Sequence, residues 1–405
     1  MVIDAKELYE KIEEFMEKEV TIQGWIRNHR KQKEFGFIDF SDGTCFNHIQ
    51  VVYDDKLDDF DDIQKYHVGS AIEVSGKVVA SPKEGQAFEI QASKVTLLGD
   101  CPEDYPIQPK KHSREFLREQ AYLRPRTNLF QAVFRVRSVA AYAIHKYFQD
   151  RGYVYFHAPL ITASDCEGAG EMFRAENSNT KVHANEFWMI EPEIAFCDLE
   201  GDMEIMEEML KYVVSYVLEH CSDEMSFLDK FVEKGLLDKL TKLVNSKFTR
   251  VTHKEVIDIL QKADVSWEFE PKQGEDIAKE HEKYITEYFD GPVFITDWPK
   301  DIKAFYMKQN PDGETVAAVD LEVPGAGEIM GGSQREEDYE KLVSRMRELD
   351  MDMDELDWYI NLRKFGGCVH SGFGMGFERL LIYLTGVENI RDVIPYPRTP
   401  GNCDF

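Results

Sequence analysis

Two carboxylates in the C-terminal half of the chain have the spacing of a divalent-cation site. The run "DLEVPGAGEIMGGSQR" places Asp320 on an expected strand and Glu328 after a glycine-containing loop. Carboxylates on adjacent backbone segments commonly hold Mg²⁺ while the ion bridges substrate phosphates. Spacing alone favours a simpler interpretation, two charges at the surface, so the pair needs support from other motifs.

The segment "GFGMGFER", residues 372–379, places an arginine at the start of an apolar helix. Arg379 is unfavourable there for the helix dipole and needs an anionic partner, which a triphosphate would supply. The glycines are two residues apart and the chain has no G-x-x-x-x-G-K-[ST] loop, so neither a Walker loop nor a dinucleotide-binding fingerprint is present. Taken alone, the segment predicts a tight strand-to-helix turn.

A third polar stretch, "MFRAENSNTKVHANEFWMIEPE", covers residues 172–193 and alternates charged side chains with aromatic and apolar ones. Alternation of this kind is typical of strands with one polar face and one core face. We therefore expect two strands joined by a polar turn, with the polar face available to a ligand.

The elements that position these residues fall into two groups. Residues 20–98 contain five short β-rich runs, which fit an OB-fold, although an SH3-like or other small barrel stays open. Residues 100–113 are rich in proline and charge and predict a hinge.

The remainder mixes helices with strands, which predicts an α+β domain around a largely antiparallel sheet flanked by helices. The expected helices are 127–152 and 202–220, and the expected strands are 153–162, 291–298, 303–309 and 316–324. The predicted domains are 1–99, a hinge at 100–126, and 127–405.

Composition narrows the class of protein. A 405-residue chain without a continuous apolar run of membrane-spanning length predicts a cytoplasmic protein of two or three domains with no membrane partner. Its seven cysteines show no zinc spacing and are expected to be reduced and structural. A net charge of −28 argues against nucleic-acid binding by bulk electrostatics, but basic patches remain at 27–33 and 110–126.

These motifs occur together with others in an order that resembles one enzyme family. The further motifs are "ITASDCEGAGEMF", "HANEFWMIEPEIAF", "GPVFITDWPKDIKAFYM" and "GFERLLIYLTGVENIRDVIPYPRTPGN". Together they resemble the class II aminoacyl-tRNA synthetases of the aspartate, asparagine and lysine subgroup, most closely the asparagine-specific members. The resemblance extends from "GWIRNHR" to "PRTPGN" and implies an OB-fold that binds the anticodon and a class II catalytic domain.

The resemblance also implies a reaction. L-asparagine and ATP would give asparaginyl-adenylate and pyrophosphate, and the aminoacyl group would then pass to the 3′ end of tRNA(Asn). Because the carboxylate of asparagine is itself the nucleophile, positioning would replace a catalytic base.

Residue roles follow from the matched motifs. Arg174 and Arg379 would be catalytic, gripping the α- and γ-phosphates of ATP, and the remaining implied ATP contacts are Glu176, His183, Phe187 and Glu328. Asp320 and Glu328 would hold Mg²⁺, with Ser333 beside them. Phe187 would stack on adenine.

Amino-acid choice requires hydrogen bonds, because asparagine and aspartate are nearly isosteric. By the same resemblance, Arg335 would donate to the side-chain oxygen of either substrate. Glu191 would accept from the amide nitrogen and repel a second carboxylate, and Glu171 would engage the α-ammonium. A solvated charge at a strand end is the alternative for Glu171 and Glu191.

On the barrel, Arg27, Phe37 and Gln50 match positions that contact the tRNA anticodon, with Phe35 as a substitute for Phe37 if the register differs. Family members are homodimers, and Pro159 matches a proline at their interface. A simple strand terminator is the alternative for this proline.

The chain departs from the family at one place. Relatives carry a segment between "EGAGEMF" and "FRAE", including a strand that lines the amino-acid pocket, whereas here Phe173 is followed directly by Arg174. A true deletion would expose a sheet edge. Because every other motif is intact, we favour residues omitted from the sequence.

Two other functions stay open. An aspartate-activating relative would be either an aspartyl-tRNA synthetase or a paralogue that makes asparagine through an adenylate, and the barrel counts against the second. A non-catalytic tRNA-binding paralogue would be expected to lack Arg174, Glu176 or Arg379, all of which are present.

Overall fold

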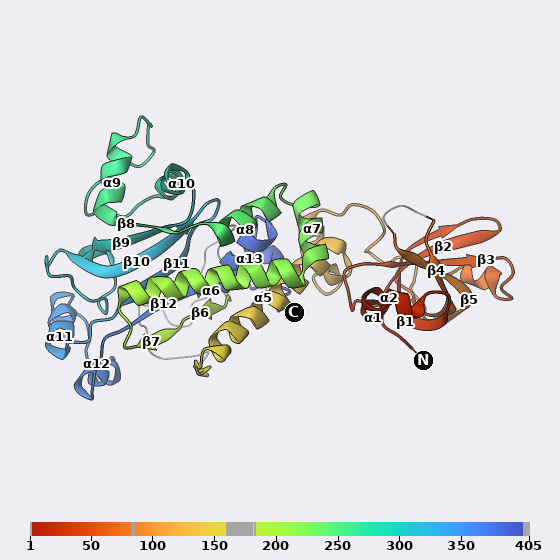
Figure 1. Cartoon of the computed structure of the whole chain (residues 1–405), viewed down its shortest axis with the longest axis horizontal. Helices are drawn as coiled ribbons and strands as arrows, with labels where there is room; N and C mark the ends of the chain where they lie inside the picture. The colour runs from red at the N-terminus through yellow and green to blue at the C-terminus, as the bar shows by residue number, and fades with distance from the viewer. Residues whose placement is uncertain (1, 83–85, 159–180, 182–183, 400–405) are drawn as a thin grey trace. The chain divides into compact units, whose positions relative to one another are not determined.

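A computed structural model describes residues 2–82, 86–158, 181 and 184–399. The chain divides into two compact units, Met1–Ala132 and Val133–Phe405 (Figure 1). The predicted hinge at 100–126 therefore groups with the barrel, together with the first residues of the long helix that follows it.

The first unit is built on a closed five-stranded barrel with the strand order β1-β2-β3-β5-β4. The five predicted β-rich runs are confirmed as strands. They are β1 (Glu19–Lys31), β2 (Phe35–Ser41), β3 (Ile49–Asp54), β4 (Ala71–Ala80) and β5 (Phe88–Gly99). The pairing of β3 with β5 is parallel and the other pairings are antiparallel. Because β2 pairs with both β1 and β3, the polar outer positions of these three strands lie side by side.

Inward-facing apolar side chains fill the barrel. Ile22, Ile38, Val51 and Val74 point inward and are fully buried. Each such side chain stabilises the fold by about 1.5–3 kcal/mol relative to exposure. The short helices of this unit are α1 (Ala5–Glu10), α2 (Ile12–Phe15), α3 (Phe60–Ile63), α4 (Arg114–Glu119) and the 3-10 turn η1 (Arg124–Arg126).

The second unit contains a seven-stranded sheet, counted over the described residues, with the order β6-β12-β11-β10-β9-β8 and β7 also paired with β12. Its strands are β6 (Met189–Ile190), β7 (Glu193–Ala195), β8 (Thr249–Thr252), β9 (Val293–Pro299), β10 (Thr315–Val323), β11 (Gly327–Gln334) and β12 (His370–Gly376). The predicted antiparallel sheet is confirmed, except that β8 runs parallel to β9.

Helices cover this sheet. They are α5 (Asn128–Asp150), α6 (Leu199–His220), α7 (Ser222–Phe231), α8 (Leu236–Asn245), α9 (His253–Lys262), α10 (Lys279–Tyr288), α11 (Tyr339–Glu348), α12 (Asp357–Lys364) and α13 (Phe377–Thr385), with 3-10 turns η2 (Lys300–Ile302) and η3 (Ile390–Asp392). Helix α6 packs against β10, β11 and β12, and α10 packs against β10 and β11 (Figure 1). No described helix is both long and apolar enough to cross a bilayer.

Two predicted strands are wrong in their described parts. Residues 153–158 form no strand, because aromatic and β-branched residues need a pairing partner to form one, and here they have none among the described residues. Residues 303–309 contribute only the single bridges Met307↔Arg335 and Gln309↔Val316. In the stretch 172–193, Pro192 separates β6 from β7, because proline cannot donate to the ladder.

Candidate active site and RNA-binding face

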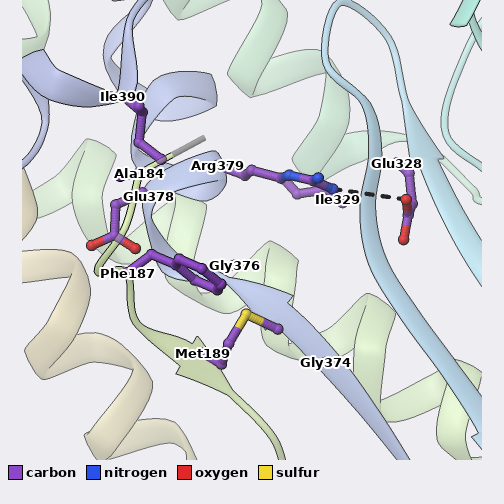
Figure 2. A pocket seen from close by; sticks show the side chains of 10 residues that line it. All are labelled: Ala184, Phe187, Met189, Glu328, Ile329, Gly374, Gly376, Glu378, Arg379 and Ile390. Carbon is purple, nitrogen blue, oxygen red and sulfur yellow. Dashed lines mark ion pairs between the residues drawn. The ribbon is translucent and has the colours of Figure 1, made fainter. Parts of the chain in front are cut away.

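The second unit has a cavity of about 230 Å³ over the paired ends of β6, β11 and β12 (Figure 2). Phe187 and Met189 form one wall, and Arg379 and Glu328 lie opposite. The floor is glycine backbone at Gly374 and Gly376. An exposed ring and an arginine facing the same hollow suit a flat base at one end and phosphates at the other.

Arg379 is in the first turn of α13, as the sequence predicts, and β12 leads directly into this helix. Its guanidinium Nη1 lies 3.7 Å from Glu328 Oε2, and both side chains are nearly half exposed. A solvated pair at this distance contributes about 0–1 kcal/mol, so a phosphate can replace the carboxylate at little cost.

Asp320 and Glu328 converge on one point above the sheet. Their carboxylate oxygens lie 3.2 and 3.1 Å from the place where a Cβ on Gly331 would stand, so any side chain there would fill the space between them. Two carboxylates around such a space fit Mg²⁺, which also takes phosphate and water oxygens. No group of three or more acidic, histidine or cysteine side chains in the described residues forms a complete metal cage.

Asp320 is also held by a lysine. Lys303 Nζ donates to Asp320 Oδ2 over 2.5 Å, and burial nevertheless raises the pKa of Asp320 to about 6. Glu322, two residues along β10, is buried, and its pKa is raised well above its usual value by burial and then by Glu282 and Glu328. Because burial and the neighbouring carboxyls raise these pKa values, a cation bound beside Asp320 and Glu328 would stabilise the ionised forms.

A buried network fixes the end of the cavity near Phe187. Arg137 of α5 donates to Glu378 Oε1 at 2.9 Å, and Glu378 Oε2 accepts from the backbone N–H of Trp188 at 2.8 Å. The Arg137 guanidinium also lies over the rings of Trp188 and Phe377, which stack on each other. This network holds Phe187 and Arg379, the neighbours of Trp188 and Glu378, in fixed relation.

Arg335 directly follows β11 and marks a second polar region. Its guanidinium contacts Ser333, which is on the same sheet face as Gly331 because the two are two residues apart in β11. It donates to Glu193 from Nη2 at 2.6 Å and to Ser333 Oγ at 2.6 Å. Its pKa is raised: burial is the largest single cause and lowers it, but the hydrogen bond to Glu193 and the charges of Glu193, Tyr306 and Tyr359 together outweigh burial. The structure thus pairs Arg335 with Glu193 and with Ser333, and Glu191 is exposed.

Asp202 of α6 lies under the same region. Its carboxylate is fully buried, neither oxygen has a hydrogen-bond partner among the described residues, and Oδ2 lies 3.1 Å from the place of a Cβ on Gly332. Burial raises the pKa of Asp202 to about 7, with Arg335 acting against the rise and Glu193 adding to it. Since Gly332 faces away from Gly331, this carboxyl is on the opposite sheet face from Asp320.

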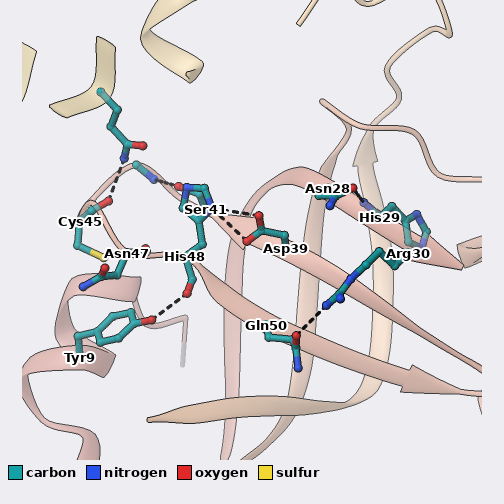
Figure 3. A network of polar contacts seen from close by, with 12 residues as sticks. Tyr9, Asn28, His29, Arg30, Asp39, Ser41, Cys45, Asn47, His48 and Gln50 are labelled. Atoms are coloured by element: carbon teal, nitrogen blue, oxygen red, sulfur yellow. Dashed lines mark hydrogen bonds and ion pairs between the residues drawn. The ribbon is translucent and has the colours of Figure 1, made fainter. Parts of the chain in front are cut away.

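On the outer face of the barrel, Gln50 lies with Arg30 (Figure 3), and the Phe37 ring lies against the same arginine. Arg30 Nη2 donates to Gln50 Oε1 at 3.0 Å and its guanidinium is 5.0 Å from the centre of the Phe37 ring. Gln50 in turn donates to Glu89. Arg27 is not part of this group and lines a separate cavity instead.

Comparison with known proteins agrees with these two regions. The description "tRNA synthetases class II (D, K and N)" fits residues 169–400, and "OB-fold nucleic acid binding domain" fits residues 20–98. The chain is 54% identical to the asparagine–tRNA ligase of Acholeplasma laidlawii (strain PG-8A), with 100% of each chain covered. The chain belongs to the asparaginyl-tRNA synthetases.

Other members of the family support the assignment. The asparagine–tRNA ligase of Clostridium tetani (strain Massachusetts / E88) is 49% identical over 100% of this chain and 99% of its own. The crystal structure of asparaginyl-tRNA synthetase from Pyrococcus horikoshii complexed with asparaginyl-adenylate superposes with a TM-score of 0.85 at 30% identity, covering 96% of this chain and 97% of that one. The predicted OB-fold and class II catalytic domain are confirmed.

The family comparison also bears on the expected missing segment. The alignment with the Acholeplasma synthetase spans 463 positions and this chain has 405 residues, so at least 58 positions face gaps here. That relative therefore carries residues absent from this chain, as expected. The predicted location, between Phe173 and Arg174, lies outside the described residues.

Five predicted site residues also lie outside the described part of the chain: Pro159, Glu171, Arg174, Glu176 and His183. The sequence did not point to Arg137, Lys303 or Glu193, which lie near the cavity of the second unit, or to Arg30 on the barrel. Arg30 and Phe37 are directly paired in the β1–β2 register, so the alternation of outward positions was the available signal. Arg137 gave no such signal, because its partner is more than 200 residues away.

Proposed function

We propose that this chain is an ATP-dependent asparagine–tRNA ligase that activates L-asparagine as asparaginyl-adenylate and transfers it to the 3′ end of tRNA(Asn). The observation that carries the proposal is the single cavity shared by Phe187, Arg379 and Glu328, with Asp320 beside Glu328 above Gly331. A ring, a solvent-exposed guanidinium and converging carboxylates are what a magnesium-bound nucleotide requires.

In this proposal the protein accelerates the reaction by holding ATP and asparagine in a fixed relation to each other. Phe187 stacks on the adenine, and Arg379 leaves Glu328 to bind the γ-phosphate. Asp320 and Glu328 would hold Mg²⁺, and the ion would supply positive charge beside the phosphates. The buried Arg137–Glu378 pair prevents Phe187 and Arg379 from drifting apart, which matters because a misplacement of about 1 Å can cost about 100-fold in rate.

Arg335 provides the anchor for the amino acid. Its Nε and Nη2 now bind Glu193, and Nη1 binds Ser333, so the guanidinium is oriented before a substrate arrives. We infer that it donates to the side-chain oxygen of asparagine. Glu193 and the exposed Glu191 would accept from the amide nitrogen and repel the carboxylate of aspartate.

The outer face of the barrel would bind the anticodon of tRNA(Asn). Phe37 offers a ring for stacking, and Gln50 offers an amide for reading a base edge. Arg30 has the place in this group that the sequence analysis gave to Arg27. We also propose that the enzyme is a homodimer in the cytoplasm, where charged tRNA is used by ribosomes.

The test is pyrophosphate exchange with purified protein, Mg²⁺ and either amino acid. Exchange with asparagine and not with aspartate is expected, and a Glu191→Gln variant should accept aspartate better relative to asparagine. Exchange with aspartate alone would overturn the assignment in favour of an aspartate-activating relative. tRNA binding without any exchange would favour a non-catalytic paralogue.

A further inference from the structure

The first unit contains a second cavity, of about 480 Å³, which none of the roles above uses. Its basic lining comes from both stretches that the sequence marks as basic patches. Arg27 belongs to the first patch, and Lys110, Lys111, His112 and Arg126 belong to the second. The fold therefore joins two separate basic segments into one concave wall.

The positive charge of this wall is poorly balanced. Asp39 is the one carboxylate in the described lining, and it already bonds His48 at 3.0 Å (Figure 3). Among the described residues, Arg27, Lys110 and Lys111 form no ion pair. Burial is the main cause that lowers the pKa of Arg27; Tyr105 and Asp39 act against it, and the positive charge of Arg126 adds to it. Confined like charges of this kind favour an anionic ligand.

Two aromatic rings hold one of the arginines in place. The Arg126 guanidinium lies 5.9 Å from the centre of the Trp25 ring and 5.8 Å from that of Tyr105. A guanidinium fixed between rings loses little entropy on binding, and its planar fork matches the oxygens of a phosphate.

The cavity adjoins the base-reading face. Asp39, which lines the cavity, is directly opposite Gln50 in the β2–β3 register, and neighbouring strands are about 4.8 Å apart. An RNA base at Gln50 would therefore lie about one strand spacing from the lining of the cavity.

We propose that this cavity binds a backbone phosphate of the tRNA, through Arg27, Arg126 and the two lysines, beside the bases read by Phe37 and Gln50. The inference rests on the proposed function, because it assumes that RNA occupies the barrel face. A free polyphosphate has the same chemistry, so the experiment separates these two sources.

The experiment measures tRNA(Asn) binding over a range of salt concentrations. Parent protein is compared with K110Q/K111Q, whose side chains are exposed, and with R27Q. K94A, an exposed lysine of β5 outside the cavity lining, is the matched control. Thermal unfolding of each variant shows whether the fold is kept, and tripolyphosphate is titrated separately as the free anion.

Removal of one cation that touches a phosphate should reduce the slope of log affinity against log salt by about 0.7–0.9. In K110Q/K111Q we expect the slope to fall by the amount for one or two phosphate contacts, and in K94A we expect the slope of the parent protein. An unchanged slope in K110Q/K111Q and in folded R27Q would overturn the inference. It would also be overturned if these variants were impaired in tripolyphosphate binding only. Either result leaves asparagine-dependent exchange, and so the proposed function, intact.

Discussion

The cavity lined by Phe187 and Arg379 and the outer face of the barrel both carry charged side chains, but these side chains differ in burial and in their partners. Around the cavity of the second unit, most charges are paired and at least one partner of each pair is largely buried: Arg137 with Glu378, Lys303 with Asp320, and Arg335 with Glu193, whereas Arg379 and Glu328 form a half-exposed pair. On the barrel, Arg30 and Phe37 are exposed or half-buried, and the main contact of Arg30 is a neutral amide.

The difference reflects what each ligand demands. Bond-making needs groups fixed within about 0.5 Å, which only a packed and hydrogen-bonded surrounding provides. Reading a single-stranded base relies on stacking and adaptable hydrogen bonds, and these tolerate side-chain movement. Substitutions around the cavity should therefore affect stability and chemistry together, whereas substitutions on the barrel should affect RNA affinity.

The largest expected effect is on the buried Arg137–Glu378 pair. In R137A, Glu378 keeps its burial and loses its cation, so the free energy of unfolding should fall by about 3–5 kcal/mol. Chemical denaturation followed by tryptophan fluorescence measures this, because Trp188 is in the network. R137K keeps the charge and should recover part of the loss. If R137A had the same free energy of unfolding as the parent, the Arg137–Glu378 pair would contribute nothing to stability.

Arg379 tests the chemistry of the same cavity. R379A removes the proposed γ-phosphate contact, so kcat/KM for ATP in pyrophosphate exchange should fall about 100- to 1,000-fold, or about 3–4 kcal/mol. R347A, at an exposed position of α11, is the control and should match the parent. A reduction of less than threefold in R379A would mean that this arginine does not touch the nucleotide.

The buried carboxyl of Asp202 should make the stability of the protein depend on pH. Its pKa rises from 3.8 to about 7 on folding, so the folded state holds a proton that the unfolded state has released between these values. Stability should therefore fall by about 3 kcal/mol as the pH rises from about 4 to 7. D202N removes this dependence and should be more stable than the parent at pH 8. Parallel pH profiles of unfolding free energy for parent and variant would contradict the assignment.

The smallest effect is expected on the barrel. F37L loses a stacking surface, so the free energy of tRNA(Asn) binding should weaken by about 1–2 kcal/mol. The KM for tRNA(Asn) in aminoacylation should then rise roughly 5- to 30-fold. F35L is the matched control, because the Phe35 ring contacts that of Phe37 and was the alternative in the sequence analysis. A larger effect of F35L than of F37L would move the base-stacking role to Phe35.

The sequence alone was sufficient for features set by local pattern. The five barrel strands follow from alternating hydrophobicity, and the β12–α13 turn that carries Arg379 follows from glycines ahead of an apolar helix. Phe187, Arg379, Asp320 and Glu328 could be named through the resemblance. Local pattern also misled, since the aromatic run at 153–158 has strand composition and forms no strand.

Only the tertiary structure decided which charges meet. Glu193 binds Arg335, Arg30 rather than Arg27 lies with Gln50, and Arg137 meets Glu378 across more than 200 residues. The physical reason is that periodicity tells which face of an element a side chain occupies, whereas pairing depends on register and on packing between distant elements. Burial has the same origin: Asp202 is an ordinary helix aspartate in the sequence, and its raised pKa exists because α6 packs beneath Gly332.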